Sequence, residues 1–168
     1  MKLAIEEALA PLVGLPLWSA GRTLDLEWFH FGGRRKDSRG GQEIEVGDYA
    51  IHTQCSWRIA GPHGIAVAFR DRFAPRGNPD EIPEDFDCNQ PAVTLCDERM
   101  EALFGQQGAS LVVEGVVVGE CGCFSLVLKG GFSLDIFPDD SSNREHWRLF
   151  RPRIEQPHFV VTGSGIEE

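Results

Sequence analysis

The stretch 49–59 (YAIHTQCSWRI) has the clearest alternation of apolar and polar residues in the chain. A period of two is typical of a strand with one face against a core and the other toward solvent. We therefore expect a single strand over 49–59. The apolar face consists of Tyr49, Ile51, Thr53, Cys55, Trp57 and Ile59, and the polar face of Ala50, His52, Gln54, Ser56 and Arg58.

Turn residues on either side of this stretch predict further short elements. Gly61, Pro62 and Gly64 predict a turn into a partner strand at 65–70. Apolar runs bounded by Gly, Pro, Asp or Asn predict other strands at 22–31, 111–118, 121–128, 132–137, 146–150 and 158–162. The glycine-rich stretch 32–41 and the proline-rich stretch 71–92 predict loops.

Two segments predict helices. Residues 2–10 form a short helical pattern that ends before Pro11. Residues 95–104 follow Thr94, a good N-cap, with Asp97 in the first turn opposing the positive end of the helix dipole. The expected fold is α+β: a mostly antiparallel sheet of about seven to eight strands with an N-terminal helix and one mid-chain helix. At 168 residues without repeats, we expect one domain over 1–168.

Charge is the first property that bears on function. The formal net charge is −10, and a surface that binds nucleic acid needs clustered cations, so the sequence predicts no nucleic-acid partner. Residues 80–101 carry eight carboxylates against Arg99 alone. This segment is either a solvated loop and helix start or an acidic surface that docks a basic protein partner. The acidic surface centres on Asp80, Glu81, Glu84, Asp85 and Asp87.

The polar face of 49–59 is the best candidate for a ligand or partner site. His52, Gln54 and Arg58 share this face, and Arg58 offers a forked cation suited to a carboxylate. The nearby strands could add Glu27, His30, His146 and Arg148. The alternative is an ordinary solvated face, or an internal salt bridge between Arg58 and Glu27.

The cysteines and the N-terminus predict a reduced, cytoplasmic protein. Five cysteines cannot all pair within one chain. Glu6, Glu7 and Pro11 interrupt the N-terminal apolar stretch, so we expect no signal peptide, and no apolar run is long enough to predict a membrane span.

We expect no metal site and no cofactor. His52 and Cys55 form an H-x-x-C pair, but an odd spacing on a strand directs their side chains to opposite faces. Cys121 and Cys123 share a face, yet two thiols alone are not a zinc site. Phosphate-binding, dinucleotide-binding, hydrolase, zincin and EF-hand motifs are missing, and no nucleophile has a recognisable base, so the sequence favours a non-enzymatic role.

The segments GLPLWSAGRTLDLEWFHFG, VGDYAIHTQCSWRI, LDIFPDDSSNREHWRLFRP and HFVVTGSGIE span most of the chain. In this order they resemble a family of small bacterial cytosolic proteins without assigned biochemistry, which implies no catalytic residue or cofactor. Two hypotheses remain. One is a binding protein whose acidic surface meets a basic partner, with toxin neutralisation as an analogy of size and charge only. The other is a small-ligand-binding domain or an enzyme that uses His52, Arg58 and His146.

Overall fold

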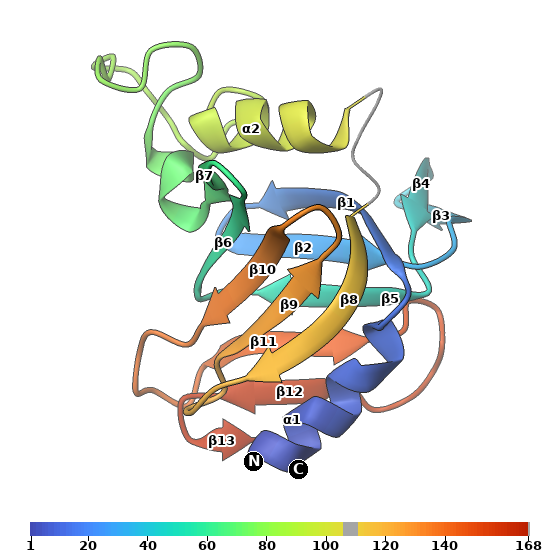
Figure 1. Ribbon diagram of the computed structural model, residues 1–168. Helices are drawn as coiled ribbons and strands as arrows, with labels where there is room; N and C mark the ends of the chain where they lie inside the picture. Colours follow the sequence, from blue (N-terminus) through green and yellow to red (C-terminus); the bar gives the residue numbers. More distant parts are fainter. Residues whose placement is uncertain (106–110, 168) are drawn as a thin grey trace.

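The computed structural model describes residues 1–105 and 111–167 of the chain. Its regular secondary structure consists mostly of antiparallel strands, with two helices, which confirms the expected α+β class (Figure 1). The helices are α1 (Lys2–Leu9) and α2 (Leu95–Phe104), and the short 3₁₀ helices are η1 (Ala10–Leu12) and η2 (Phe69–Phe73). The strands are β1 (Pro16–Thr23), β2 (Leu26–Phe31), β3 (Arg35–Arg39), β4 (Gln42–Val46), β5 (Tyr49–Thr53), β6 (Ser56–Gly61), β7 (Gly64–Ala68), β8 (Leu111–Val118), β9 (Phe124–Leu128), β10 (Phe132–Phe137), β11 (Glu145–Phe150), β12 (Phe159–Thr162) and β13 (Gly165–Ile166).

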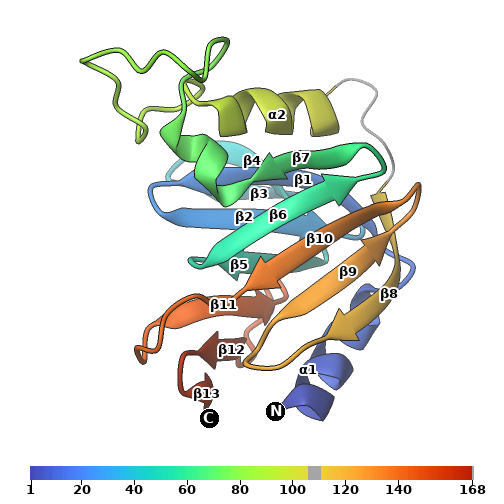
Figure 2. The same cartoon turned by 60° about the vertical axis from the view of Figure 1, so that its left-hand side comes forward.

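The main sheet bends over itself into two layers. Its strand order is β13-β12-β11-β5-β2-β1-β8-β9-β10-β6-β7, and β3 and β4 form a separate two-stranded sheet. The front layer (β8, β9, β10, β6 and β7) lies across the back layer (β1, β2, β5, β11, β12 and β13), as two views show (Figures 1 and 2). The core lies between the layers, where apolar residues of both form one buried cluster.

The predicted single strand over 49–59 is wrong in one respect, because the chain turns a corner at Gln54 and Cys55. β5 pairs with β2 and β11, whereas β6 pairs with β10 and β7. The corner keeps its backbone groups bonded: Gln54 N–H donates to His146 O at 2.8 Å, and Ser56 N–H donates to Asp139 Oδ2 at 3.1 Å. A bend of this kind lets one segment of chain leave one sheet layer and continue as a strand in the layer packed against it.

The predicted apolar face of 49–59 is buried on both sides of the corner. Ile51, Thr53, Cys55, Trp57 and Ile59 are all buried, and the alternation continues because each of them points into the same core. The alternation therefore contained no sign of the bend. Ala50 is the exception on the other face, where it is fully buried.

The expected count of seven to eight strands is also wrong: the main sheet has eleven. The predicted strand 22–31 is a hairpin of β1 and β2 that turns at Leu24, whose φ is 53°. The predicted loop 32–41 contributes most of the β3–β4 hairpin, whose cross-strand ion pair Lys36–Glu43 is exposed. The strands β3 and β4 are polar and β13 has only two residues, so none of them contains an apolar run that would predict a strand.

Both predicted helices are present. The Thr94 hydroxyl accepts from Asp97 N–H at 3.2 Å, and the Asp97 carboxylate accepts from Thr94 N–H at 3.0 Å, so the two residues form a capping box at the start of α2. α1 buries Ile5 and Leu9 and contacts β8. Neither helix has the length and apolar character needed to cross a bilayer, as far as the described residues extend.

Candidate functional site

Two of the residues predicted for a ligand site, His52 and Arg148, lie side by side on the outer face of the back layer. They are register partners on β5 and β11. The His52 ring meets Phe150 edge-on, with centroids 4.7 Å apart. Arg148 forms an ion pair with Glu145, and its Nη1 lies 3.2 Å from His158 Nδ1. The structure thus brings an imidazole and a guanidinium together on one open face.

Aromatic rings continue from this pair across neighbouring strands. On β2, Trp28 is the register partner of His52. The Trp28 ring stacks on the His30 ring, with centroids 4.8 Å apart. His30 also contacts Trp18 on β1 at 5.6 Å, and the Arg34 guanidinium lies 4.6 Å from the centre of the Trp18 ring. We call these rings the aromatic row: Trp18, Trp28, His30, His52, Phe150 and His158.

The sequence did not predict the aromatic row as a unit. Trp18 lies in the part of β1 before residue 22, where the sequence predicted no strand, whereas Trp28 lies within the predicted strand 22–31, so their proximity was not predicted. Trp28 lies directly over Gly21, where a Cβ atom would overlap its ring. Burial lowers the pKa of His30 to about 4, so its imidazole is neutral at neutral pH.

Arg58 belongs to a different surface. It lies on β6 in the front layer, where its Nε donates to Asp135 Oδ2 at 2.8 Å and its guanidinium lies over Phe137. Gln54 is exposed at the corner between β5 and β6. The bend therefore separates Arg58 from His52, although the sequence places them six residues apart on one face. The proposed Arg58–Glu27 salt bridge is not formed, because Asp135 is the partner of Arg58.

Glu27 points into the core instead of joining the outer face. It is fully buried, and Arg72 Nη1 lies 3.7 Å from its Oε1. Neither carboxylate oxygen has a hydrogen-bond partner among the described residues. Burial raises the pKa of Glu27 to about 7, against the opposing effects of Arg72 and the Trp57 indole. Glu27 is thus a buried ionisable group inside the protein, away from the aromatic row.

An open pocket of about 390 Å³ lies between β1 and α2, and none of the predicted site residues lines it. Arg22, Asp97 and Glu101 supply its charges, and Cys96, Met100 and Phe104 supply apolar walls. Arg22 donates to both Asp97 oxygens at 3.0 and 2.8 Å. Arg22 and Asp97 are thus paired with each other, and Glu101 is paired with Arg76. Arg22 was missed because no motif distinguishes an arginine within a strand.

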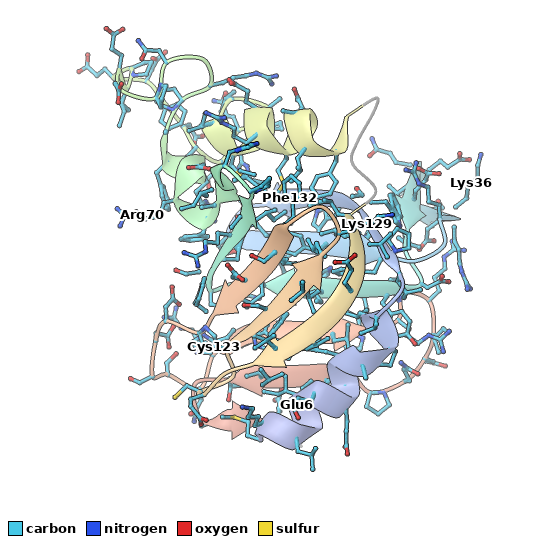
Figure 3. All side chains as sticks on the ribbon, viewed as in Figure 1. Glu6, Lys36, Arg70, Cys123, Lys129 and Phe132 are labelled. Carbon is cyan, nitrogen blue, oxygen red and sulfur yellow. The ribbon has the colours of Figure 1, made fainter. Side chains whose placement is uncertain are left out.

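The acidic surface lies on a loop that projects from the body (Figures 1 and 2). We call residues 78–91 the acidic loop. Asp80, Glu81, Glu84 and Asp85 are exposed and form no ion pair within the part of the chain that the structure describes. Asp87 is also exposed and accepts from Asn89 N–H at 2.9 Å. Side-chain oxygens at the tip of the loop point away from the rest of the molecule (Figure 3).

The other acids of 80–101 are engaged with the body. Asp97 pairs with Arg22, and Glu101 pairs with Arg76. The Glu98 carboxylate accepts from Gly77 N–H at 2.8 Å. The segment that the sequence presented as one acidic run therefore has two parts. Its helical acids hold the structure together, and its loop acids face solvent.

Arginines fix the base of the acidic loop. Arg22 donates to the carbonyls of Cys88 and Gln90 at 2.7 and 2.8 Å. Arg76 N–H donates to Val93 O at 2.8 Å, beside a bridge between Pro75 and Thr94. The loop is thus clamped at its base, whereas its acidic tip makes no ion pair with any described residue of the body.

All five cysteines are free. Cys55 is buried in the core, and burial raises the pKa of its thiol to about 12, so it remains a thiol at neutral pH. His52 lies on the outer face, so the H-x-x-C pair points to opposite sides as predicted. Cys121 and Cys123 lie at the turn between β8 and β9, with Cys123 labelled in Figure 3.

A different set of potential metal ligands converges near the corner. Asp139, Asp140 and His146 place one ligand atom each within 4.8 Å of one another. His146 was predicted to join His52 and Arg58, but it is buried at the start of β11 and faces these aspartates instead. The only signal in the sequence was a pair of aspartates directly after a strand and a histidine at the start of the next.

Comparisons with known proteins give no evidence for or against the family resemblance. The family resemblance therefore stays a prediction. No protein-family model, curated protein or solved structure matches the chain.

Proposed function

We propose that this chain is a non-enzymatic binding protein that docks a basic protein partner through the acidic loop. The observation that carries the proposal is a loop on a clamped base with five carboxylates and no cation, in which no carboxylate forms an ion pair with another described residue. The partner class is a basic protein, of which a basic toxin would be one example.

Electrostatics favours such a partner. Exposed charges steer an encounter over about 8–10 Å at physiological ionic strength, and the loop carries its charges to the outer limit of the molecule. A clamped base reduces the conformational entropy that is lost on binding. The charge therefore acts mainly on the rate of association.

An apolar side chain within the acidic loop could anchor the complex. Ile82 is 64% exposed and lies between the carboxylates of Glu81 and Glu84. Charges at the rim of an interface contribute mainly to rate and specificity, whereas a buried apolar residue contributes affinity. Ile82 surrounded by acids has this arrangement.

The test begins with capture of a partner from the source cell by the full chain. Association is then measured over a series of salt concentrations for wild type and for D80N/E81Q/E84Q/D85N. A matched control, E7Q/E114Q/E120Q/E155Q, removes four exposed carboxylates elsewhere. Both variants change the net charge from −10 to −6, because each removes four negative charges.

We expect the loop variant to associate at least about tenfold more slowly, with a shallower salt dependence, and the control to stay near wild type. Dissociation should change less. A captured partner that binds the loop variant at the wild-type rate would show that the acidic loop is only solvated. Equal slowing of both variants would attribute the effect to net charge rather than to the loop.

The aromatic row supports a second candidate, a small-ligand-binding surface. Half-buried rings of Trp28, His52 and Phe150 offer stacking faces, and Arg148 adds a cation beside them. Such a face suits a planar anionic ligand. Under this hypothesis the captured molecule binds the loop variant normally and loses binding on Arg148→Ala. Under the first proposal the pattern is reversed.

A further inference from the structure

The corner between β5 and β6 meets the loop between β10 and β11, and there the ligand atoms of Asp139, Asp140 and His146 come together. We propose that these three residues bind one divalent transition-metal ion of the zinc class. The site is separate from the acidic loop, so this inference does not depend on the proposed function.

The buried histidine is the first support for the site. His146 is 2% exposed, and its Nε2 has no hydrogen-bond partner among the described residues. That nitrogen lies 3.9 Å from Asp140 Oδ1, too far for a hydrogen bond. An unpaired buried ring nitrogen is costly, and a metal ion would satisfy its lone pair.

A β-bulge aims this histidine at the aspartates. Along β11, Glu145 and Trp147 pair with the adjacent residues Thr162 and Val161, so His146 is an extra residue in the ladder. His146 and the next residue, Trp147, are both buried at this bulge. Bulges commonly redirect a side chain next to a functional site.

Hydrogen bonds hold both carboxylates in place. Asp139 Oδ2 accepts from Ser56 N–H at 3.1 Å and from its hydroxyl at 2.5 Å. Asp140 Oδ1 accepts from Ser142 N–H at 2.7 Å and from its hydroxyl at 2.6 Å. Such partners are typical of metal-ligating carboxylates, since they orient the ligand oxygen before the ion arrives. Asp139 Oδ1 accepts no hydrogen bond from a described residue, so it can bind an ion.

Neighbouring turns support the loop that carries the aspartates. Gly163 lies so close to Ser142 O that a Cβ atom there would overlap it. Gly122 packs near Pro138, where a Cβ atom would lie 3.5 Å from its Cγ. Among the described residues, the only nearby cation is Arg144. Its Nη2 lies 3.4 Å from Asp140 Oδ2, and its side chain is 80% exposed. It can move away when an ion binds.

The donor set and spacing fit zinc. Zinc takes imidazole nitrogen at about 2.0–2.1 Å and carboxylate oxygen at about 2.0–2.2 Å, which separates the ligand atoms by about 3–3.5 Å. Small rotations of the two exposed aspartates would close the present separations. Three protein ligands leave a position open toward solvent, where water or a ligand can bind.

The experiment measures Zn²⁺ binding to the full chain by calorimetry, with the thiols kept reduced. We expect one ion per chain in wild type. Binding should weaken at least tenfold in D139N/D140N, which keeps the side-chain shapes at exposed positions, and in H146A. The matched controls are D80N/D85N, with the same charge change, and H63A, which removes an exposed histidine.

Cysteine ligation is tested separately. C121S/C123S should bind Zn²⁺ as wild type does, and Co²⁺ bound to wild type should show no thiolate charge-transfer band. Three results would overturn the site: no Zn²⁺ bound by wild type, wild-type affinity in D139N/D140N, or loss of binding only in C121S/C123S. Because D139N/D140N alters exposed side chains, the test remains decisive if H146A does not fold.

Discussion

The buried carboxyl of Glu27 is the most unusual single residue of the core. It is fully buried, Arg72 Nη1 lies 3.7 Å from its Oε1, and burial raises its pKa to about 7 from an ordinary value of 4.5. The folded protein therefore holds a proton on Glu27 between pH 4.5 and 7, whereas the unfolded chain does not. Unfolding releases that proton, so a rise in pH across this window destabilises the fold.

Glu27→Gln should flatten this part of the pH profile. Below about pH 4.5 the carboxyl is neutral in both states, so its ionisation does not affect stability. Above about pH 7 the cost of ionising it in the core is complete and lowers the free energy of unfolding by about 3 kcal/mol. Denaturant unfolding at several pH values would measure the difference. His30, whose pKa is lowered to about 4, has the opposite slope between about 4 and 6.5, but both proteins share it. Exposed Glu120→Gln is the control, and parallel profiles for wild type and E27Q would contradict the prediction.

Trp57 should be the most costly residue to lose from the segment 49–59. It is 2% exposed and meets Phe29 edge-on at 5.2 Å. Trp57→Ala should lower the free energy of unfolding by about 3–5 kcal/mol, because it leaves a large cavity between the layers. Gln54→Ala, an exposed change in the same segment, should stay within about 0.5 kcal/mol. A thermal midpoint for W57A within about 2 °C of wild type would refute the assignment of Trp57 to the core.

Among the elements, α2 and the acidic loop depend on one arginine of β1. Arg22 is only 6% exposed in its side chain, and it reaches Asp97 on α2 and two loop carbonyls. The Asp97 carboxylate also completes the N-cap at Thr94. Burial acts to raise the pKa of Asp97, but the hydrogen bonds from Arg22 and Thr94 outweigh it and lower that pKa. The Arg22 guanidinium thus links β1 to both α2 and the acidic loop.

Arg22→Lys should loosen this junction while keeping the charge. A lysine cannot make the two-pronged contact with Asp97 and still reach both carbonyls, so we expect a loss of about 1–3 kcal/mol. Limited proteolysis with mass spectrometry should detect faster cleavage within 78–91. Arg35→Lys, at an exposed ion pair with Asp48, is the control and should leave the rate unchanged. Unchanged cleavage in R22K would show that the loop is fixed by other contacts.

At the scale of the whole molecule, strand pairing and connections of the chain join the layers. The segment of β5 and β6 crosses from the back layer to the front, and β1 pairs with β8 through two register pairs. The buried apolar cluster draws on both layers, including Phe29 and Trp147 from the back and Leu126 and Ile136 from the front. Neither layer can keep its inner face buried without the other.

The chain should therefore unfold as one cooperative unit, in line with the single domain that its length predicts. Far-ultraviolet circular dichroism reports the strands, and tryptophan fluorescence reports packing around Trp57 and Trp147 in opposite layers. We expect the two denaturation curves to coincide. W57A should shift both curves together. Two separate transitions would mean that the layers are independent units.

The sequence alone was sufficient for features that depend on near neighbours in the chain. Alternation along 49–59 identified the buried face because side chains on a strand alternate at each residue. The Thr94 cap of α2 and the exposed acidic loop likewise follow from a few consecutive residues. The acidic loop was predicted as a surface, and its role in binding stays a prediction.

Only the tertiary structure decided which distant residues meet. The bend at Gln54 and Cys55 leaves the alternation intact, so the sequence placed His52 and Arg58 on one surface although they lie in different layers. Glu27 is buried beside Arg72 of η2 and Trp57 of β6, which are distant from it in the sequence. His146 meets the aspartates through a bulge in the pairing with β12. Such features arise from contacts between strands, which the order of residues within one strand does not encode.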